Sequence, residues 1–206
     1  MSETQAILTH ATPGYRFAQW STWAFGAVWF RESFTGREHL PRAGGVVVVS
    51  NHQSFLDIPV LSHAIPRHVS FVARDSLANF KPLAWLMRTC GAVLIKRGAP
   101  DRAALREMVA HLEQGDCLVI FPEGTRTSDG RVQEFKAGAL LAARMAKVPL
   151  VPCAIRGSFE ALPKRALFPR PRKIRVQFGT PIDSTLPDAL ERAQAAVSGM
   201  AGDGRA

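Results

Sequence analysis

The sequence is poor in cysteine and tyrosine. Its three cysteines, Cys90, Cys117 and Cys153, are odd in number, widely spaced and set among apolar residues, which argues against a disulfide framework or a zinc site. We expect them to be small core residues in a reducing compartment. With one tyrosine and no recognisable helix-turn-helix, RNA-recognition or zinc-finger pattern, the chain is a poor fit for a nucleic-acid partner.

Acidic residues are also scarce. The 17 Asp and Glu residues are outnumbered by 26 Lys and Arg, so the net charge is +9. This balance favours phosphate-rich partners, and an anionic membrane, coenzyme A, an acidic carrier protein and nucleic acid all qualify by charge alone. The chain has no evident internal repeat or interdomain linker, and its 206 residues suit one domain that buries about 70% of its unfolded surface.

The N-terminal region contains an aromatic stretch without charge. Residues 17–30 hold three of the four tryptophans and are flanked by Arg16 and Arg31. The stretch is shorter than the roughly 20 residues that span a bilayer, so we expect it to lie on the membrane, with its indoles among the headgroups. The alternative is an aromatic helix packed on the rest of the protein. The stretch lacks a small-residue cleavage site, which disfavours a secretory signal.

A second segment, residues 164–175, mixes cations with apolar residues and contains no acid. Its cations are Lys164, Arg165, Arg170, Arg172, Lys173 and Arg175. Such a segment suits an anionic bilayer surface, where each cation contributes about 1 kcal/mol. A solvated loop is the alternative. Both segments together predict a monotopic or peripheral protein on the cytoplasmic face of a membrane.

Apolar runs alternate with helical patterns along the chain. Strands are expected at 46–50, 69–73, 92–96, 117–121, 150–155 and 173–178. Helices are expected at 101–114, which Gly115 would end, and at 136–147. This order predicts an α/β fold, with a mixed, partly parallel sheet flanked by helices. We divide the chain into a membrane-associating helical segment (1–40), a catalytic domain (41–197) and a flexible tail (198–206).

A polar block, residues 51–57, directly follows the strand expected at 46–50. His52 would therefore lie at the carboxyl end of that strand, where open α/β sheets usually bind ligands. Imidazole paired with a carboxylate can take a proton from an alcohol. We expect His52 to be the general base and Asp57 to fix its tautomer and stabilise the imidazolium.

The spacing of this pair restricts its geometry. Five extended residues span roughly 17 Å, and on one continuous helix the two side chains would point about 140° apart. They can meet only across a turn, so we expect His52 in a loop and Asp57 at a helix start, with Pro59 in the first turn. The alternative is a polar loop histidine and an ordinary N-cap aspartate.

A second polar block, residues 121–126, follows the strand expected at 117–121 and reads Phe-Pro-Glu-Gly-Thr-Arg. Together, His52-x4-Asp57 and this block resemble the glycerolipid acyltransferases, the family typified by lysophosphatidic acid acyltransferase. Residues 74–82, Gly91 and 95–97 are similar to the family's second block, and residues 151–157 are similar to its fourth. The four blocks stand in the family's order and cover roughly residues 46–157.

The resemblance implies transfer of a fatty acyl group from acyl-coenzyme A or acyl carrier protein to a lysophospholipid hydroxyl. The first acceptor to expect is 1-acylglycerol 3-phosphate, which would give phosphatidic acid. Glycerol 3-phosphate, another lysophospholipid and a lyso-ornithine-type lipid are alternatives. His52 and Asp57 take the roles of base and partner, and no metal or prosthetic group is implied.

The resemblance also implies an acceptor-phosphate site. It assigns this site to Arg97, Glu123, Gly124, Thr125 and Arg126, with Arg74 and Pro152 beside a substrate pocket. Guanidinium groups hold phosphate oxygens bidentately, and Gly124 would let backbone N–H groups approach an anion. Solvation at the surface is the alternative for the arginines.

Two members of these blocks leave questions open. Glu123 could hold Arg126, bind a glycerol hydroxyl or cap the next helix. The family often has lysine where this chain has Arg74, and Glu-Leu where it has Asp75-Ser76. The acceptor preference carried by that block therefore stays open.

The chemistry has rivals as well. We expect the deprotonated acceptor to attack the thioester directly, and Ser54 is the nearby hydroxyl that could instead act as a nucleophile. A thioesterase could use the same pair on water. A membrane-binding module without activity is the third class.

Overall fold

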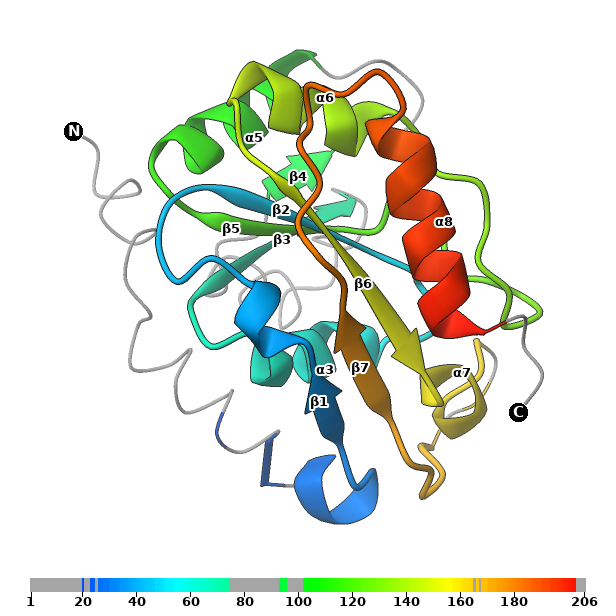
Figure 1. The fold of residues 1–206 in the computed structure, drawn as a ribbon. Coiled ribbons are helices and arrows are strands. Elements are labelled where there is room, and N and C mark those ends of the chain that lie inside the picture. Colours follow the sequence, from blue (N-terminus) through cyan, green and yellow to red (C-terminus); the bar gives the residue numbers. More distant parts are fainter. Residues whose placement is uncertain are drawn as a thin grey trace.

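The computed structural model describes residues 20, 23, 24, 26–74, 93–95, 102–164, 166 and 168–202. Seven strands form one sheet in the order β1-β7-β6-β2-β5-β3-β4 (Figure 1). The strands are β1 (Ser33–Thr35), β2 (Val46–Ser50), β3 (Val69–Arg74), β4 (Val93–Ile95), β5 (Cys117–Ile120), β6 (Leu150–Arg156) and β7 (Arg175–Phe178). All neighbours pair in parallel except β6 and β7, so the predicted mixed, partly parallel sheet is confirmed.

Strand β2 lies in the middle of the sheet, between β5 and β6. Its four valines are completely buried, as expected for a parallel strand covered on both faces. Val46 and Val48 point into one apolar core, and Val47 and Val49 into the other. The chain leaving β2 therefore starts from a rigid, fully buried support.

Helices cover both faces of the sheet (Figure 1). They are η1 (Arg37–His39), α3 (Asp57–Ala64), α5 (Arg102–Glu113), α6 (Gly138–Met145), α7 (Ser158–Ala161) and α8 (Ala189–Ala201). Helices α3 and α7 pack into the core on one face, and α5, α6 and α8 into the core on the other. The helix predicted at 101–114 is confirmed, and Gly115 ends it with φ +91°. The helix predicted at 136–147 is shorter by two residues at each end.

The sheet begins earlier in the chain than the sequence predicted. Residues 33–35, assigned to a helical segment, form β1, which pairs in parallel with β7. Phe30 and Leu40 belong to the core, and the Glu32 carboxylate lies 3.0 Å from His63 Nδ1 of α3. A three-residue edge strand carries too short a pattern to be read, so the boundary at residue 41 was wrong for this stretch.

The C-terminal end also differs from the prediction. The tail expected from residue 198 continues as α8 to Ala201, and residues 203–206 lie outside the described part. Val197 is buried and Met200 packs against the core beside α8. Gly and Ala near the end suggested fraying, but the apolar face of the helix is held by the sheet.

The two described cysteines are core residues, as predicted. Cys117 and Cys153 are free and buried in β5 and β6, the two strands that flank β2. Burial raises the pKa of the Cys117 thiol to about 12, so it stays protonated. Cys90 lies outside the described residues.

The prediction for residues 17–30 falls partly outside the described residues, because 17–19, 21, 22 and 25 are not among them. Within the described ranges, none of the helices has the length and apolar character needed to cross a bilayer.

Candidate active site

The two polar blocks meet at one edge of the sheet. Strands β2 and β5 pair in parallel, with Val49 opposite Ile120, so the loops that follow them leave the sheet side by side. The His52 loop and the 121–126 loop are therefore neighbours. This is the edge at which parallel α/β sheets bind ligands.

His52 and Asp57 are in contact, as the spacing predicted. His52 Nδ1 lies 2.9 Å from Asp57 Oδ2, across a turn that ends where Asp57 begins α3. The same carboxylate oxygen accepts the backbone N–H groups of Gln53 (2.7 Å) and Ser54 (2.8 Å). Three hydrogen-bond donors thus converge on Asp57 Oδ2. They fix the orientation of this carboxylate, which is completely buried.

This contact determines which imidazole nitrogen can act as a base. A carboxylate can only accept hydrogen bonds, so we assign the proton to His52 Nδ1 and leave Nε2 to accept one. The His52 side chain is 17% exposed, against 0% for Asp57, and Nε2 has no partner among the described residues. Asp57 therefore holds the Nδ1 edge of the imidazole, and a substrate can reach the Nε2 edge.

Phe121 supports the imidazole from one face. The two rings stack with centroids 4.0 Å apart and an interplanar angle of 17°. Phe121 also packs against the core on the α3 side, so it ties the plane of the imidazole to the sheet. The sequence placed Phe121 in the second polar block without a role, because stacking depends on how the two loops pack.

The backbone of His52 is held by the second loop. Its N–H donates to Glu123 Oε1 at 3.2 Å, and its carbonyl oxygen accepts the Thr127 N–H at 2.8 Å. Glu123 forms no ion pair with Arg126 within the described ranges, and α6, the next helix, begins 15 residues later at Gly138. The structure therefore gives Glu123 a contact that none of the expected roles included.

Glu123 carries an unusual carboxyl group. It is 4% exposed, and its Oε2 has no hydrogen-bond partner among the described residues. Burial raises the pKa of Glu123 to about 7, although the hydrogen bond from the His52 N–H opposes this effect. The carboxyl that holds the His52 backbone therefore titrates near neutral pH.

This pKa predicts how Glu123→Gln changes stability. Between the ordinary pKa of 4.5 and about 7, the folded protein keeps a proton that the unfolded chain has lost, so the Glu123 contribution to the free energy of unfolding falls as pH rises. Glutamine does not titrate and can still accept the His52 N–H. Urea unfolding at about pH 5 and about pH 8 measures this effect. The free energy of unfolding of the variant, relative to that of the wild type, should be higher at about pH 8 than at about pH 5. An equal difference at both values would mean that Glu123 titrates normally.

Gly124 shapes the second loop. Its φ is +71°, a conformation that favours glycine, and its N–H donates to the Phe121 carbonyl oxygen at 3.0 Å. The turn therefore uses that N–H, and only other N–H groups of the loop could face an anion, as predicted for this glycine. A Cβ at this position would lie 3.0 Å from Lys136 Nζ, so an amine crosses the loop here. The sequence did not single out Lys136, which lies beyond the block. Thr125, the next residue, is exposed.

Arg126 is the cation that the loop presents beside the pair. Its Cζ lies 3.7 Å from the centroid of the Phe55 ring, and it makes no hydrogen bond or ion pair with any described residue. Burial lowers the pKa of Arg126, and the Asp57 carboxylate opposes this effect. Arginine stays protonated in proteins, so a positive charge with unused N–H donors lies near His52.

Of the other predicted residues, only Pro152 has a described side chain. Pro152 is buried in β6 opposite Val49, and its ring packs at Gly179, so the structure puts it in the sheet interior on the α8 side. Arg97 lies outside the described residues. Arg74 is the last residue of β3, and its side chain is not described.

Ser54 is poorly suited to be a nucleophile. It is completely buried, and its hydroxyl donates to the Leu162 carbonyl oxygen at 2.9 Å while accepting the Leu56 N–H at 3.3 Å. The hydroxyl proton is thus directed away from His52.

A second His-x4-Asp pair lies at the opposite edge of the sheet. His111 Nδ1 is 2.7 Å from Asp116 Oδ2, just before β5 begins. The side chain of His111 is 6% exposed, against 17% for His52. The pattern alone therefore does not define a site; the stacked ring, the reachable nitrogen and the nearby arginine distinguish His52. No three His, Cys, Asp or Glu side chains within the described ranges are grouped to hold a metal ion.

Comparisons with known proteins agree on one group. A family model described as Acyltransferase matches residues 31–156. The chloroplastic 1-acyl-sn-glycerol-3-phosphate acyltransferase BAT2 of Brassica napus is 34% identical over 137 residues, which are 65% of this chain and 40% of that protein. The 1-acyl-sn-glycerol-3-phosphate acyltransferase of Bacillus subtilis is 31% identical over 122 residues, 59% of this chain and 60% of that protein.

A solved structure matches more of the chain. The crystal structure of the 1-acyl-sn-glycerophosphate (LPA) acyltransferase PlsC from Thermotoga maritima superposes with a TM-score of 0.75 at 28% identity, covering 90% of this chain and 78% of that one. The chain spans only about 40% of the length of the plant relatives it matches.

Proposed function

This chain belongs to the acyltransferase family, and we propose that it transfers a fatty acyl group from a coenzyme A or carrier-protein thioester to 1-acyl-sn-glycerol 3-phosphate, which forms phosphatidic acid. The observation that carries this proposal is the His52–Asp57 contact beside an Arg126 that forms no hydrogen bond or ion pair with a described residue. The names of the relatives support the choice of acceptor.

In the proposed reaction, His52 Nε2 is the proton acceptor. The acceptor hydroxyl donates to His52 Nε2, and its oxygen attacks the thioester carbonyl carbon as the proton moves to Nε2. The tetrahedral intermediate collapses, the C–S bond breaks, and the imidazolium returns the proton to the departing thiolate. Asp57 stabilises the imidazolium through Nδ1. An ester and a thiol are formed without an acyl-enzyme, a metal or a prosthetic group.

The acceptor's phosphate explains the cations beside the pair. Arg126 has unused donors that match phosphate oxygens, and the Lys136 amine crosses the same loop at Gly124. We assign the acceptor phosphate to Arg126. Glycerol 3-phosphate, other lysophospholipids and a lyso-ornithine-type lipid remain rival acceptors.

A panel of acceptors tests the proposal. Purified protein would receive radiolabelled palmitoyl-coenzyme A and each candidate acceptor, and the products would be separated by thin-layer chromatography. We expect labelled phosphatidic acid from 1-acylglycerol 3-phosphate, and little product from a lysolipid without a terminal phosphate. Preference for an acceptor that lacks phosphate would refute the assignment.

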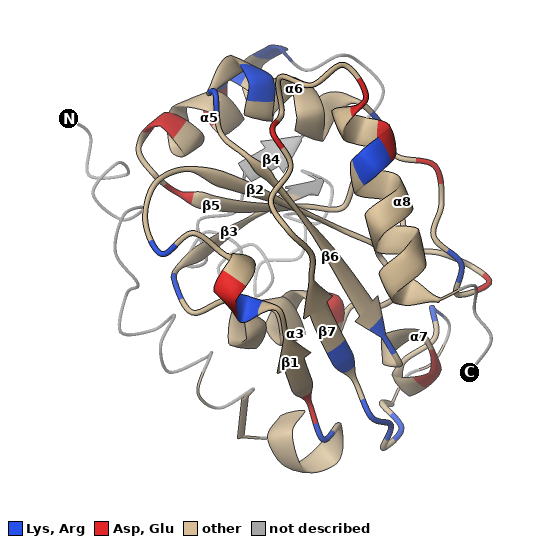
Figure 2. Ribbon diagram, viewed as in Figure 1, with Lys and Arg blue, Asp and Glu red and all other residues tan. Residues whose placement is uncertain are grey.

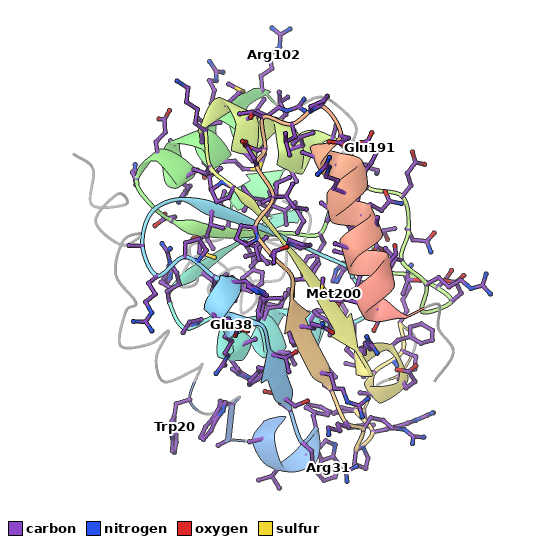
Figure 3. The ribbon with its side chains drawn as sticks, viewed as in Figure 1. Trp20, Arg31, Glu38, Arg102, Glu191 and Met200 are labelled. Atoms are coloured by element: carbon purple, nitrogen blue, oxygen red, sulfur yellow. The ribbon has the colours of Figure 1, made fainter. Side chains whose placement is uncertain are left out.

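We further propose that one end of the molecule binds the cytoplasmic face of an anionic membrane. Trp29 Nε1 donates to the Pro169 carbonyl oxygen at 3.4 Å, which joins the N-terminal aromatic stretch to the basic segment. Trp29 is 41% exposed and Phe168 is 81% exposed. Exposed cations surround them: Arg31, Arg170, Arg172, Lys173 and Arg175. Figure 2 shows blue segments gathered beyond β7, and Figure 3 places Trp20 and Arg31 at the same end.

Vesicle binding tests this surface. Replacing Arg170 and Arg172 by alanine should weaken cosedimentation with phosphatidylglycerol vesicles about 30-fold, because each cation contributes about 1 kcal/mol. Replacing Arg102 and Arg106, which removes the same charge from α5, is the matched control; Figure 3 shows Arg102 at the far end. If both double variants lost the same amount of vesicle binding, only the net charge would matter, and binding through a defined surface would be contradicted.

A further inference from the structure

Phe55 is a large apolar side chain that faces solvent beside the proposed base. It is 49% exposed in the turn that precedes α3. Its neighbours Leu56 and Ile58 pack against the core on the α3 side, but Phe55 belongs to neither apolar core. Core packing therefore does not account for an aromatic ring at this position.

The ring contacts Arg126. The guanidinium carbon lies 3.7 Å from the ring centroid, which is van der Waals contact over the aromatic face. This contact uses the π cloud and none of the N–H donors. Arg126 is thus held by a neighbour that does not compete with a ligand for its hydrogen bonds.

Both partners stand on anchored backbone. Ser54, which precedes Phe55, donates its N–H to Asp57 Oδ2 at 2.8 Å. Thr127, which follows Arg126, is 2% exposed and donates its N–H to the His52 carbonyl oxygen at 2.8 Å. The Phe55 ring and the Arg126 guanidinium therefore come from two loops whose backbones are both bonded to the His52–Asp57 pair.

We propose that Phe55 is a positioning residue for the acceptor: its ring holds the Arg126 guanidinium ready for the acceptor's phosphate beside His52. The inference rests on the proposed function, which supplies that phosphate. A long arginine side chain loses rotamer entropy when it is ordered, and an arginine that the ring has already ordered loses less on binding. Phe55 therefore acts on acceptor affinity through Arg126.

Steady-state kinetics with 1-acylglycerol 3-phosphate test this role. Phe55→Leu removes the ring and keeps an apolar side chain, whereas Phe55→Tyr keeps the ring. We expect Phe55→Leu to raise the acceptor KM about 2- to 30-fold, the range that cation–π contacts cover, and to leave kcat and the thioester KM within about 2-fold. Phe55→Tyr should stay within about 2-fold of the wild type. Met145→Leu, at a side chain of 50% exposure on α6, is the matched control and should change nothing.

A double-mutant cycle separates positioning from a structural effect. In an Arg126→Ala background, Phe55→Leu should change the acceptor KM less than about 2-fold, because the group it positions is gone. An unchanged KM in Phe55→Leu, or an equal loss with and without Arg126, would overturn the inference. If the wild type forms no ester, the proposed function fails instead. The Arg126 Nε–H proton resonance then still decides the geometry, because the ring should shift it upfield in the wild type and not in Phe55→Leu.

Discussion

Replacing His52 by asparagine should lower the rate of acyl transfer at least about 100-fold, whereas the same replacement at His111 should leave the rate unchanged. General-base catalysis typically contributes about 10²- to 10⁴-fold, and the variant has no nitrogen at the position of Nε2. The asparagine amide can still donate to Asp57, so the turn before α3 keeps its hydrogen bond. Initial rates with labelled palmitoyl-coenzyme A and 1-acylglycerol 3-phosphate measure the effect.

His111 is a closely matched control for His52. It also contacts a carboxylate through Nδ1, at 2.7 Å from Asp116, but it lies at the opposite edge of the sheet. Circular dichroism would verify that both variants are folded. If the His52 variant kept a tenth of the wild-type rate, or if the His111 variant lost as much, His52 would not be the base.

Replacing Arg126 by alanine should raise the acceptor KM about 10- to 150-fold and leave the thioester KM nearly unchanged. Hydrogen bonds to charged groups contribute about 1.5–3 kcal/mol, and no described residue takes the Arg126 donors that we assign to the acceptor phosphate. Arg126→Lys should recover part of the loss, since lysine keeps the charge and loses the bidentate geometry. Acceptor and thioester titrations of each variant give the two constants. Equal changes in both constants would mean that Arg126 does not bind the phosphate.

The sequence was sufficient to predict the meeting of His52 and Asp57. The run of four valines in β2 placed His52 at the carboxyl end of a buried strand, and the spacing left a turn before a helix as the only way for the two side chains to meet. The two buried apolar runs also predicted that each polar block leaves the end of a strand, and the structure adds that these strands, β2 and β5, pair in parallel. These features depend on local patterns and on general rules for α/β sheets.

Other features of the site depend on how distant loops pack. Glu123 was expected to face Arg126, a glycerol hydroxyl or a helix end, but it accepts the N–H of a residue 71 positions away. The stacking of Phe121 on His52 and of Phe55 on Arg126 has no local signature either. Each contact joins the first polar block to the second, so only the folded arrangement reveals it.

Short or weakly patterned elements were missed for a different reason. Strand β1 has three residues and helix α7 has four, and neither is long enough to show a period. Helix α8 contains Gly199 and ends in small residues, so its last turn, from residue 198, was predicted to be a tail. Its burial against β6 and its neighbours stabilises it.

The most direct measurement of the central claim is thiol release by the wild-type protein, with and without the acceptor. Palmitoyl-coenzyme A would be supplied at a fixed concentration, the free thiol followed by a colorimetric reagent, and the lipid products quantified in the same samples. We predict that release requires 1-acylglycerol 3-phosphate and equals the phosphatidic acid formed. Release at the same rate without the acceptor, with free palmitate as the product, would show that the His52–Asp57 pair activates water and that the protein is a thioesterase.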